Sequence, residues 1–253
     1  VKWVSVFPGN RKRGLATVGA TILLNSARTG ELQAVLGGGA STALRTAATG
    51  ALAAQLMARP DTSTVALIGA GLQARYQLKA LLPLYDLRKV RVWGALKGEA
   101  DRFCSSFDGP RSMLEPAPDV ESAVSGADLI VTCTPSRKPL VQARWVGPGT
   151  HINAIGADAP GKQELDPRIL THARVVVDER GQAAHSGEIN VPISRGLYSE
   201  RSIHASLADL VVGRRPGRSG PREITVFDST GLAVLDIHFA RYAYRALKGR
   251  GRL

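Results

Sequence analysis

The chain has 253 residues, of which 44% are hydrophobic, and a mean hydropathy of −0.04. It is long enough to bury a substantial core, as one large domain or two smaller ones. No run approaches the roughly 18 apolar residues of a membrane span, and the first residues lack the pattern of a signal peptide. We therefore expect no membrane partner. Cys104 and Cys133 fall in separate predicted elements, which argues against a disulfide framework and predicts a cytoplasmic protein.

The formal net charge of +12 raises the question of nucleic-acid binding. The basic residues gather in predicted loops and in the tail, at 11–13, 214–218 and 248–252. No aromatic residues are interleaved with them, so the sequence predicts no stacking platform for single strands. It also has no zinc-ligand spacing. The composition therefore favours a solvated, arginine-rich surface and no nucleic-acid partner.

The first 60 residues predict strands followed by one helix. Short strands separated by turns are expected at 3–7, 21–25 and 32–36. Three glycines at 37–39 then break the pattern. Ser41 or Thr42 can cap an alanine-rich helix that runs to about Met57.

Residues 65–77 are the most informative stretch. The first four are apolar and predict a buried strand, and a helical pattern follows. Gly69, Gly71 and Ala74 stand between them at the spacing of a dinucleotide-binding turn. The first glycine permits the tight turn, the second lets the backbone approach a pyrophosphate, and the small alanine lets the helix pack on the strand. We expect phosphates at the free N–H groups of this helix; a glycine triplet without such flanks is often only a turn.

From residue 65 to about 228, predicted strands and helices alternate, which is typical of a parallel sheet covered on both faces. A basic surface loop is expected at 213–221 and a final helix up to Leu247. The fold class is therefore α/β: a Rossmann-type doubly wound parallel sheet at 61–230, inserted in a second, smaller α+β domain that both chain ends form. A substrate is expected in the cleft between the domains, at the carboxyl ends of the strands.

Two charged residues are candidates for chemistry. Arg45 is predicted in the first turn of its helix, where a cation opposes the helix dipole unless an anion binds there; a solvated arginine that tolerates the penalty explains it equally well. Asp158 follows a predicted strand and could accept a proton, but an Asx turn before Pro160 is the alternative that the residues alone favour. The five histidines show no metal spacing, so no metal site is predicted.

Several segments together resemble the ornithine cyclodeaminase/mu-crystallin family over nearly the whole chain. They are residues 2–10, 42–48, 68–74, 132–135, 153–165 and 227–231. The resemblance implies a Rossmann domain at 61–230 and a dimerisation and substrate domain made from 1–60 and 231–253. It also implies a homodimer, NAD or NADP as the cofactor, and an amino acid or imino acid as the substrate.

The resemblance also implies roles for single residues. Asp158 matches the catalytic aspartate, and Lys2 and Arg45 match positions that hold the substrate carboxylate. The implied cofactor-binding positions are Gly69, Ala70, Gly71, Leu72, Gln73, Ala74, Thr132, Thr134, Asp228, Ser229 and Gly231.

Three departures from the family pattern affect these expectations. The family usually carries several tens of residues before the lysine that matches Lys2, including another carboxylate-binding arginine, so we expect NAD(P) binding but weak amino-acid turnover from this form. The glycines at 37–39 replace a segment that often carries an acidic residue. No acid stands at 93–97, where NAD-using members place one, and Lys97 could face a 2′-phosphate, so the cofactor choice stays open.

The first functional hypothesis is a cyclodeaminase that converts ornithine or lysine to a cyclic imino acid with release of ammonia, because the stretch around Asp158 is intact. An alanine dehydrogenase or a ketimine/imine reductase with net NAD(P)H turnover is the second. A non-catalytic, crystallin-like nucleotide-binding protein is the third, from another class.

Overall fold

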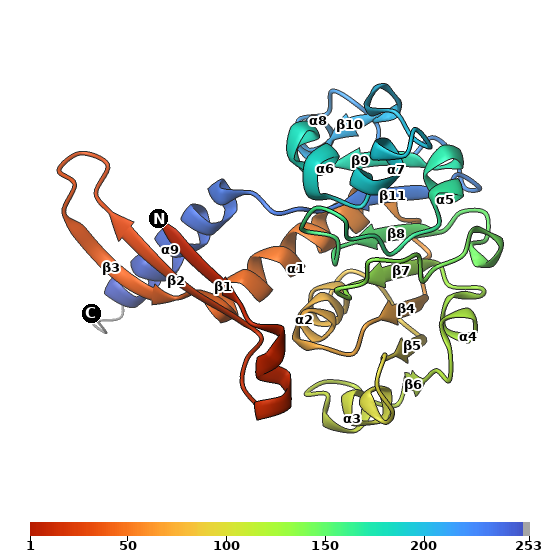
Figure 1. The fold of residues 1–253 in the computed structure, drawn as a ribbon, viewed down its shortest axis with the longest axis horizontal. Coiled ribbons are helices and arrows are strands. Elements are labelled where there is room, and N and C mark those ends of the chain that lie inside the picture. The colour runs from red at the N-terminus through yellow and green to blue at the C-terminus, as the bar shows by residue number, and fades with distance from the viewer. Residues whose placement is uncertain (250–253) are drawn as a thin grey trace. The chain divides into compact units, whose positions relative to one another are not determined.

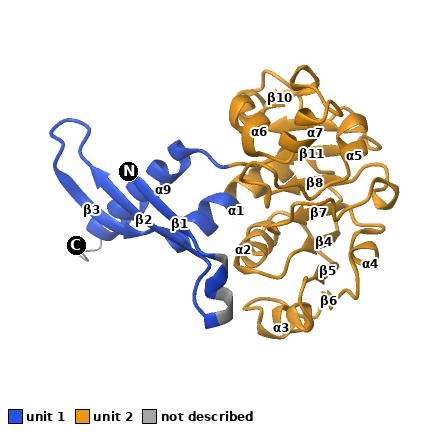
Figure 2. Ribbon diagram, viewed as in Figure 1, with its two compact units in different colours: residues 1–46, 231–253 blue, residues 47–230 orange. Residues whose placement is uncertain are grey.

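The structure is a computed structural model that describes residues 1–249, without the side chains of Pro8, Arg11 and Lys12. Parts of the predicted basic segments 11–13 and 248–252 therefore lie outside the described residues. The chain divides into two compact units: unit 1 comprises 1–46 and 231–253, and unit 2 comprises 47–230 (Figure 2). One division between the units falls between residues 46 and 47, inside a helix.

Unit 2 contains an eight-stranded parallel sheet in the order β10-β9-β11-β8-β7-β4-β5-β6, which runs as one row of strands in Figure 1. The strands are β4 (Thr64–Ile68), β5 (Lys89–Trp93), β6 (Leu114–Pro116), β7 (Leu129–Thr132), β8 (His151–Ala154), β9 (Arg174–Val177), β10 (Ala205–Ser206) and β11 (Thr225–Asp228). The predicted α/β class with a doubly wound parallel sheet is confirmed. The sequence patterns missed β6 and β10, which have only three and two residues.

The helices of unit 2 alternate with these strands. They are α2 (Leu72–Leu81), α3 (Glu99–Ser106), α4 (Val120–Val124), α5 (Pro167–His172), α6 (Arg180–Ser186), α7 (Asn190–Ser194) and α8 (Leu207–Val211), with short 3-10 helices η2 (Ala143–Trp145) and η3 (Glu200–Ser202).

Strand β4 is apolar throughout because both of its faces are buried. Val65 and Leu67 pack into a cluster with Leu78 of α2, whereas Ala66 and Ile68 belong to the cluster on the other face.

The strand order places a topological switch beside β4. The chain passes from β4 to β5 and β6 on one side, and β7 and β8 then lie on the other side. In open α/β sheets, ligands bind at the carboxyl ends of the strands beside such a reversal. The carboxyl ends of β4 and β7 are therefore the place to look for a site.

Unit 1 contains a three-stranded antiparallel sheet and a long helix. The elements are β1 (Lys2–Val6), η1 (Pro8–Arg13), β2 (Val18–Asn25), β3 (Leu32–Gly37) and α9 (Ala233–Lys248). Ile22 and Leu24 of β2 form a small core with Ala240 of α9. No helix among the described residues is long and apolar enough to cross a membrane.

Helix α1 (Gly38–Met57) begins earlier than predicted. The expected cap is wrong, because the hydroxyls of Ser41 and Thr42 donate to the carbonyl of Gly38 at 2.9 and 2.7 Å from inside the helix. Gly38 is required there for packing. A Cβ at this position would lie 2.4 Å from the Cβ of Ala20 on β2. Close approach to the sheet, rather than a break in structure, explains this glycine.

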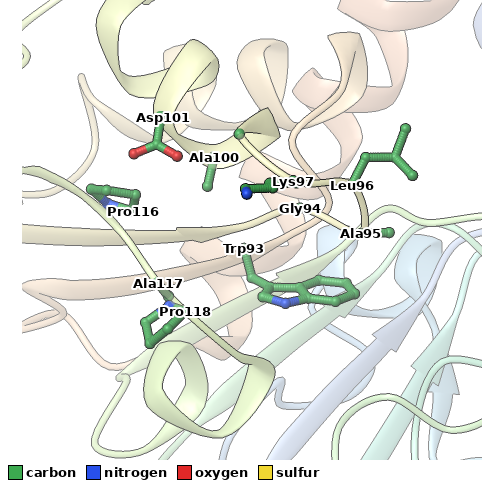
Figure 3. Close-up of a pocket in the computed structure, with 11 residues that line it drawn as sticks. Trp93, Gly94, Ala95, Leu96, Lys97, Ala100, Asp101, Pro116, Ala117 and Pro118 are labelled. Atoms are coloured by element: carbon green, nitrogen blue, oxygen red, sulfur yellow. The ribbon is translucent and has the colours of Figure 1, made fainter.

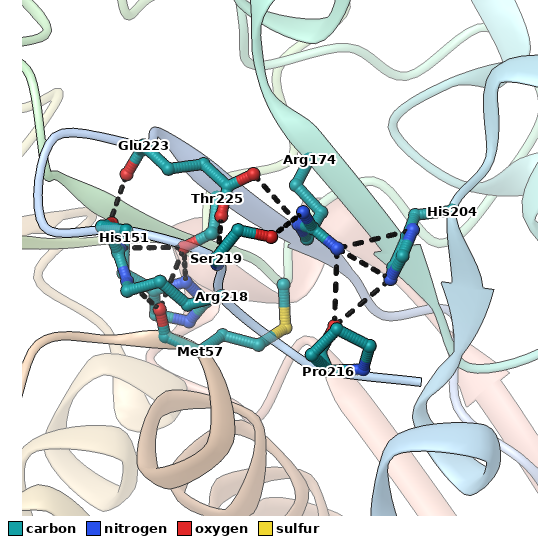
Figure 4. Close-up of polar contacts among 10 residues, drawn as sticks. Met57, His151, Arg174, His204, Pro216, Arg218, Ser219, Glu223 and Thr225 are labelled. Carbon is teal, nitrogen blue, oxygen red and sulfur yellow. Dashed lines mark hydrogen bonds and ion pairs between the residues drawn. The ribbon is translucent and has the colours of Figure 1, made fainter. Parts of the chain in front are cut away.

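A polar network lies at the amino ends of β8 and β11, which begin at His151 and Thr225, opposite the carboxyl ends at the switch point; Figure 4 shows its contacts. His151 is fully buried, with Nδ1 2.8 Å from Thr225 Oγ1 and Nε2 2.9 Å from Asn153 Oδ1. Arg218 joins the network by donating from Nε to the carbonyl of Met57 at 2.7 Å. The prediction of a solvated loop at 213–221 is therefore wrong for Arg218, whose guanidinium satisfies backbone carbonyls.

The burial of His151 predicts a pH dependence of stability. Desolvation lowers the pKa of His151 to about 3, whereas a histidine in the unfolded chain titrates near 6.5. The unfolded state therefore binds more protons between these values, so this stability is complete above about pH 6.5 and is lost as the pH falls toward 3. His151→Gln should flatten the slope of unfolding free energy against pH by up to about 1.4 kcal/mol per pH unit. Urea denaturation between pH 4 and 7.5 measures it; parallel slopes would contradict the assignment.

Candidate functional site

The turn after β4 has the backbone that the sequence predicted. Gly69 has a φ of +115°, which favours glycine, and a Cβ there would lie 2.9 Å from the carbonyl oxygen of Cys133. This residue therefore allows the ends of β4 and β7 to approach each other. Ala74 is fully buried in the cluster with Leu78, so the third small residue serves helix packing.

Gly71 differs from Gly69 in having open space around it. It is the N-cap of α2 in an extended conformation that any residue can adopt, and a Cβ would meet nothing within 4 Å. The packing of the chain therefore does not explain this glycine, whereas a ligand approaching the backbone would. The first turn of α2 has no acidic residue, and its N-cap makes no side-chain hydrogen bond. The buried Gln73 Nε2 has no acceptor among the described residues.

These features suit a phosphate group. An anion at the start of α2 would meet unsatisfied backbone N–H groups and the positive end of the helix. Leu72 is exposed beside the turn, and Ala70 is partly buried.

A surface pocket of about 480 Å³ lies at the carboxyl end of β5 (Figure 3). Its lining includes Trp93, Lys97 and Asp101. The backbone N–H of Leu96 donates to Glu99 at 2.9 Å. Two carboxylates at the start of α3 thus stand close to the stretch 93–97, which itself has no acid. The pattern at the strand end does not indicate these carboxylates, because they stand on the helix that follows it.

Glu164 joins the ends of β7 and β8. Its Oε1 accepts from the N–H and the hydroxyl of Thr134, each at 2.7 Å, and its Oε2 accepts from the N–H of Gly156 at 2.9 Å. The side chain is fully buried, and this burial raises its pKa. The predicted cofactor residue Thr134 therefore uses its hydroxyl to hold Glu164. Thr132, at the end of β7, is also buried.

Two further buried carboxylates, Glu188 and Asp228, bind backbone N–H groups next to Glu164 and next to each other. Glu188 accepts from the N–H groups of Glu164 and Leu165, at 2.9 and 2.7 Å. Asp228 in turn accepts from the N–H groups of Glu188 and Ile189, at 2.8 and 3.2 Å. Burial raises the pKa of Glu188 well above its usual value and that of Asp228 to about 7.

The family segment that contains Asp228 continues with Ser229 and Gly231. The N–H of Ser229 donates to the carbonyl of Ala154 at 3.0 Å. The Asp228 carboxylate itself is taken up by the N–H groups of Glu188 and Ile189. The cofactor role of this segment stays a prediction.

Asp158 lies on the loop between β8 and α5. Its side chain is 58% exposed and forms an ion pair with Lys162 four residues later. Among the described contacts, no backbone N–H donates to this carboxylate, so the Asx-turn alternative finds no support. The loop leaves β8 at Gly156, and Glu164 holds its two ends together. A carboxylate on such a loop can exchange protons with solvent or with a bound amine.

Lys2 and Arg45, the predicted substrate-binding cations, both form ion pairs with Asp236 in unit 1. Lys2 Nζ lies 2.9 Å and Arg45 Nε 3.0 Å from the same oxygen, Asp236 Oδ1, and both cationic side chains are only 13% exposed. Arg45 lies about two turns into α1, so the predicted conflict with the helix dipole is wrong; Asp236 balances its charge. Sequence reasoning missed Asp236, although an acid in the first turn of a helix is a usual signal.

Comparison with known proteins identifies the family. A family model described as ornithine cyclodeaminase/mu-crystallin matches residues 1–251. The chain belongs to this family. The resemblance expected from the sequence is thereby confirmed. Among the described residues, no group of three or more His, Cys, Asp and Glu side chains could hold a metal ion.

Three solved structures illustrate the range of similar proteins. An archaeal alanine dehydrogenase dimer with bound NAD is 44% identical, with a TM-score of 0.94, covering 99% of this chain and 78% of that one. The Δ1-pyrroline-2-carboxylate reductase of Thermococcus litoralis, in complex with NADH and L-proline, is 34% identical, with a TM-score of 0.95 and coverages of 99% and 78%. A lysine cyclodeaminase is 33% identical, with a TM-score of 0.89 and coverages of 100% and 72%.

The role of Glu164 as a tie between strands is testable. Glu164→Gln replaces one acceptor oxygen by an amide donor that faces N–H or O–H donors, so a buried group is left unsatisfied. We expect a loss of about 1–3 kcal/mol in the free energy of unfolding. Urea denaturation measures it, with the exposed Glu121→Gln as the matched control. Equal free energies of unfolding in the two variants would show that the hydrogen bonds of Glu164 do not stabilise the fold.

Proposed function

We propose that this protein is an NAD(P)-dependent oxidoreductase that interconverts an α-amino acid and the corresponding imino acid, with net turnover of the cofactor. The observation that carries the proposal is the open Gly71 at a phosphate-type turn, in a chain that also holds the paired cations Lys2 and Arg45. The similar alanine dehydrogenase and pyrroline-2-carboxylate reductase support it.

The cyclodeaminase expected first from the sequence is the second candidate. The accessible Asp158 with its Lys162 partner and the likeness to lysine cyclodeaminase favour it. The higher identity to the alanine dehydrogenase moves the balance toward net redox chemistry. The two candidates share the same residues and differ in whether the reduced cofactor is released.

In this proposal each group of residues has a separate role. NAD(P), when bound, would supply the hydride-transfer chemistry. The N–H groups at the start of α2 would hold its pyrophosphate, and the pocket at Trp93 and Lys97 would take its adenosine end. Lys2 and Arg45 bind the substrate carboxylate, because a guanidinium and an ammonium both donate charge-assisted hydrogen bonds to it. Asp158 accepts or returns the proton of the reacting amine.

The proposal includes a homodimer, as in the alanine dehydrogenase structure. Ile22 faces Ala240 of α9, so its neighbour Leu23 lies on the opposite face of the sheet. Leu23 pairs with Val35, and Trp3 pairs with Thr21 on that same face. Trp3 is 76% and Val35 61% exposed. An exposed apolar face of this kind is typical of a protein–protein interface.

The cofactor assignment predicts a selective effect at the turn. Gly71→Val should abolish binding of NADH and NADPH without loss of stability, because the added side chain enters space that only the ligand would fill. Fluorescence titration measures binding, and thermal denaturation measures stability. Gly220→Val is the matched control, since Gly220 also has open space but lies near the other end of the sheet. Unchanged cofactor affinity in Gly71→Val would place the phosphate site elsewhere.

The proton-transfer role predicts that Asp158→Asn retains cofactor binding but loses about 10²–10⁴-fold in turnover, the usual range for a general acid–base group. The exposed Asp86→Asn serves as the control and should keep the wild-type rate. Steady-state absorbance at the NADH band measures both variants. Near-normal turnover of Asp158→Asn would remove this residue from the mechanism.

The proposed reaction class predicts which substrates consume cofactor. We expect NADH or NADPH oxidation with pyruvate plus ammonia, or with Δ1-pyrroline-2-carboxylate. Ammonia release from ornithine or lysine at constant NADH would instead identify the cyclodeaminase. Cofactor binding without turnover of any of these compounds would support the non-catalytic alternative.

A further inference from the structure

The loop between β8 and α5 carries Asp158 and is closed by one of its own side chains. Lys162 extends back along the loop, and its Nζ forms an ion pair with Asp158 Oδ1. The same Nζ lies 3.5 Å from the carbonyl oxygen of Gly156, where the loop leaves β8. Lys162 is only 21% exposed, although lysine side chains usually extend into water. The ammonium group therefore joins the end of the loop to its start.

The backbone from which Lys162 extends is fixed by Asn190 of α7. Asn190 Oδ1 accepts from the N–H of Gly161 at 2.9 Å, and Asn190 Nδ2 donates to the carbonyl of Lys162 at 2.9 Å. Asn190 is itself buried, and its N–H donates to the carbonyl of Gly187 at 3.1 Å. One buried amide thus sets the position of the residue that binds Asp158.

The Asp158 carboxylate has no other polar contact among the described residues, and its neighbours Ala157 and Ala159 carry only methyl groups. An exposed ion pair contributes little to stability, because water screens it and both side chains lose rotamer freedom. The fold therefore gains little from this pair. A carboxylate that must meet a reacting amine, in contrast, gains a defined orientation.

We propose that Lys162 is a positioning residue for Asp158 and that Asn190 acts through Lys162. This inference rests on the proposed function, in which Asp158 exchanges a proton with the reacting amine. Lys162 holds Oδ1, which leaves Oδ2 to accept or return the proton. Asn190 keeps the peptide at 161–162 in place. Neither residue touches the reacting atoms.

The test removes the ammonium group and keeps the length of the side chain. Lys162→Met should lower kcat for the reduction of Δ1-pyrroline-2-carboxylate roughly 10–10²-fold, as expected for a misplaced catalytic group. KM for the imine and Kd for NADH or NADPH should keep their wild-type values, because Lys162 binds neither ligand. Lys162→Arg keeps a cation that can bind the carboxylate and should recover most of the rate. Steady-state absorbance and fluorescence titration measure these constants.

Chemical rescue provides a measurement that a merely structural role would not move. Propylammonium supplies the cation that Lys162→Ala lacks, so turnover of this variant should rise with its concentration. Potassium chloride at the same ionic strength should give no such rise, and the wild type should not respond to propylammonium.

A double-mutant cycle tests the link to Asn190. Asn190→Ala should also lower kcat, and its combination with Lys162→Met should lose no more than Lys162→Met alone, because both act on one carboxylate. Asn190→Asp keeps the acceptor for Gly161 and removes the Nδ2 donor, so it replaces the alanine variant if that variant does not fold. Additive losses would show that Asn190 does not act through Lys162.

Lys89→Met is the matched control. It removes an ion pair with Glu115 at 3.2 Å at the start of β5 and should keep the wild-type rate.

The outcomes separate the positioning role from the proposed function. Wild-type kcat in Lys162→Met together with a large loss in Asp158→Asn would show that the positioning role is wrong while the proposed function stands. A loss in Lys162→Met that neither Lys162→Arg nor propylammonium recovers would contradict the role as well. Near-normal turnover of Asp158→Asn, or no turnover by the wild type, would overturn the proposed function and this role with it.

Discussion

The buried carboxylate of Glu164 is the interaction on which the arrangement of unit 2 depends. It holds the start of the loop after β7 and the start of the loop after β8 through three hydrogen bonds. The first loop lies beside the nucleotide turn, because Gly69 approaches Cys133, and the second carries Asp158. A single side chain thus sets the relative positions of the proposed cofactor-binding and proton-transferring segments. Its burial is tolerable because donors surround it.

The buried carboxylates of this chain bind two kinds of donor. Glu164, Glu188 and Asp228 bind mainly backbone N–H groups, and burial raises the pKa of each. Their hydrogen bonds hold loops in place, and none of the three carboxylates is exposed to solvent. In unit 1, by contrast, the Asp236 carboxylate accepts from two side-chain cations, Lys2 and Arg45, which come from different elements.

The sequence predicted the features that depend on neighbouring residues. The turn after β4 was predictable because Gly69 and Ala74 each have a local reason: Gly69 has a positive φ and lies close to Cys133, and Ala74 packs against the strand cluster. The alternating strands and helices predicted the parallel sheet because each buried strand is apolar throughout.

Features that depend on distant partners were not predictable. The start of α1 lies where Gly38 packs closely against Ala20, and Arg218 is partly buried because it donates to the carbonyls of Met57 and Gly149. The ion pairs of Asp236 form only when β1, α1 and α9 pack together. The roles of Asp158, Lys2 and Arg45 came from the family resemblance; their geometry supports these roles without testing them.

The central claim is that this chain transfers a hydride between a nicotinamide and the Cα of an amino or imino acid. The most direct measurement uses excess enzyme with NADH or NADPH deuterated at the transferable C4 position, and Δ1-pyrroline-2-carboxylate or pyruvate plus ammonia. Mass spectrometry then locates the label. The account predicts deuterium at Cα of the proline or alanine formed. Product without deuterium, or deuterium retained in the cofactor under conditions where the cofactor is bound, would contradict it.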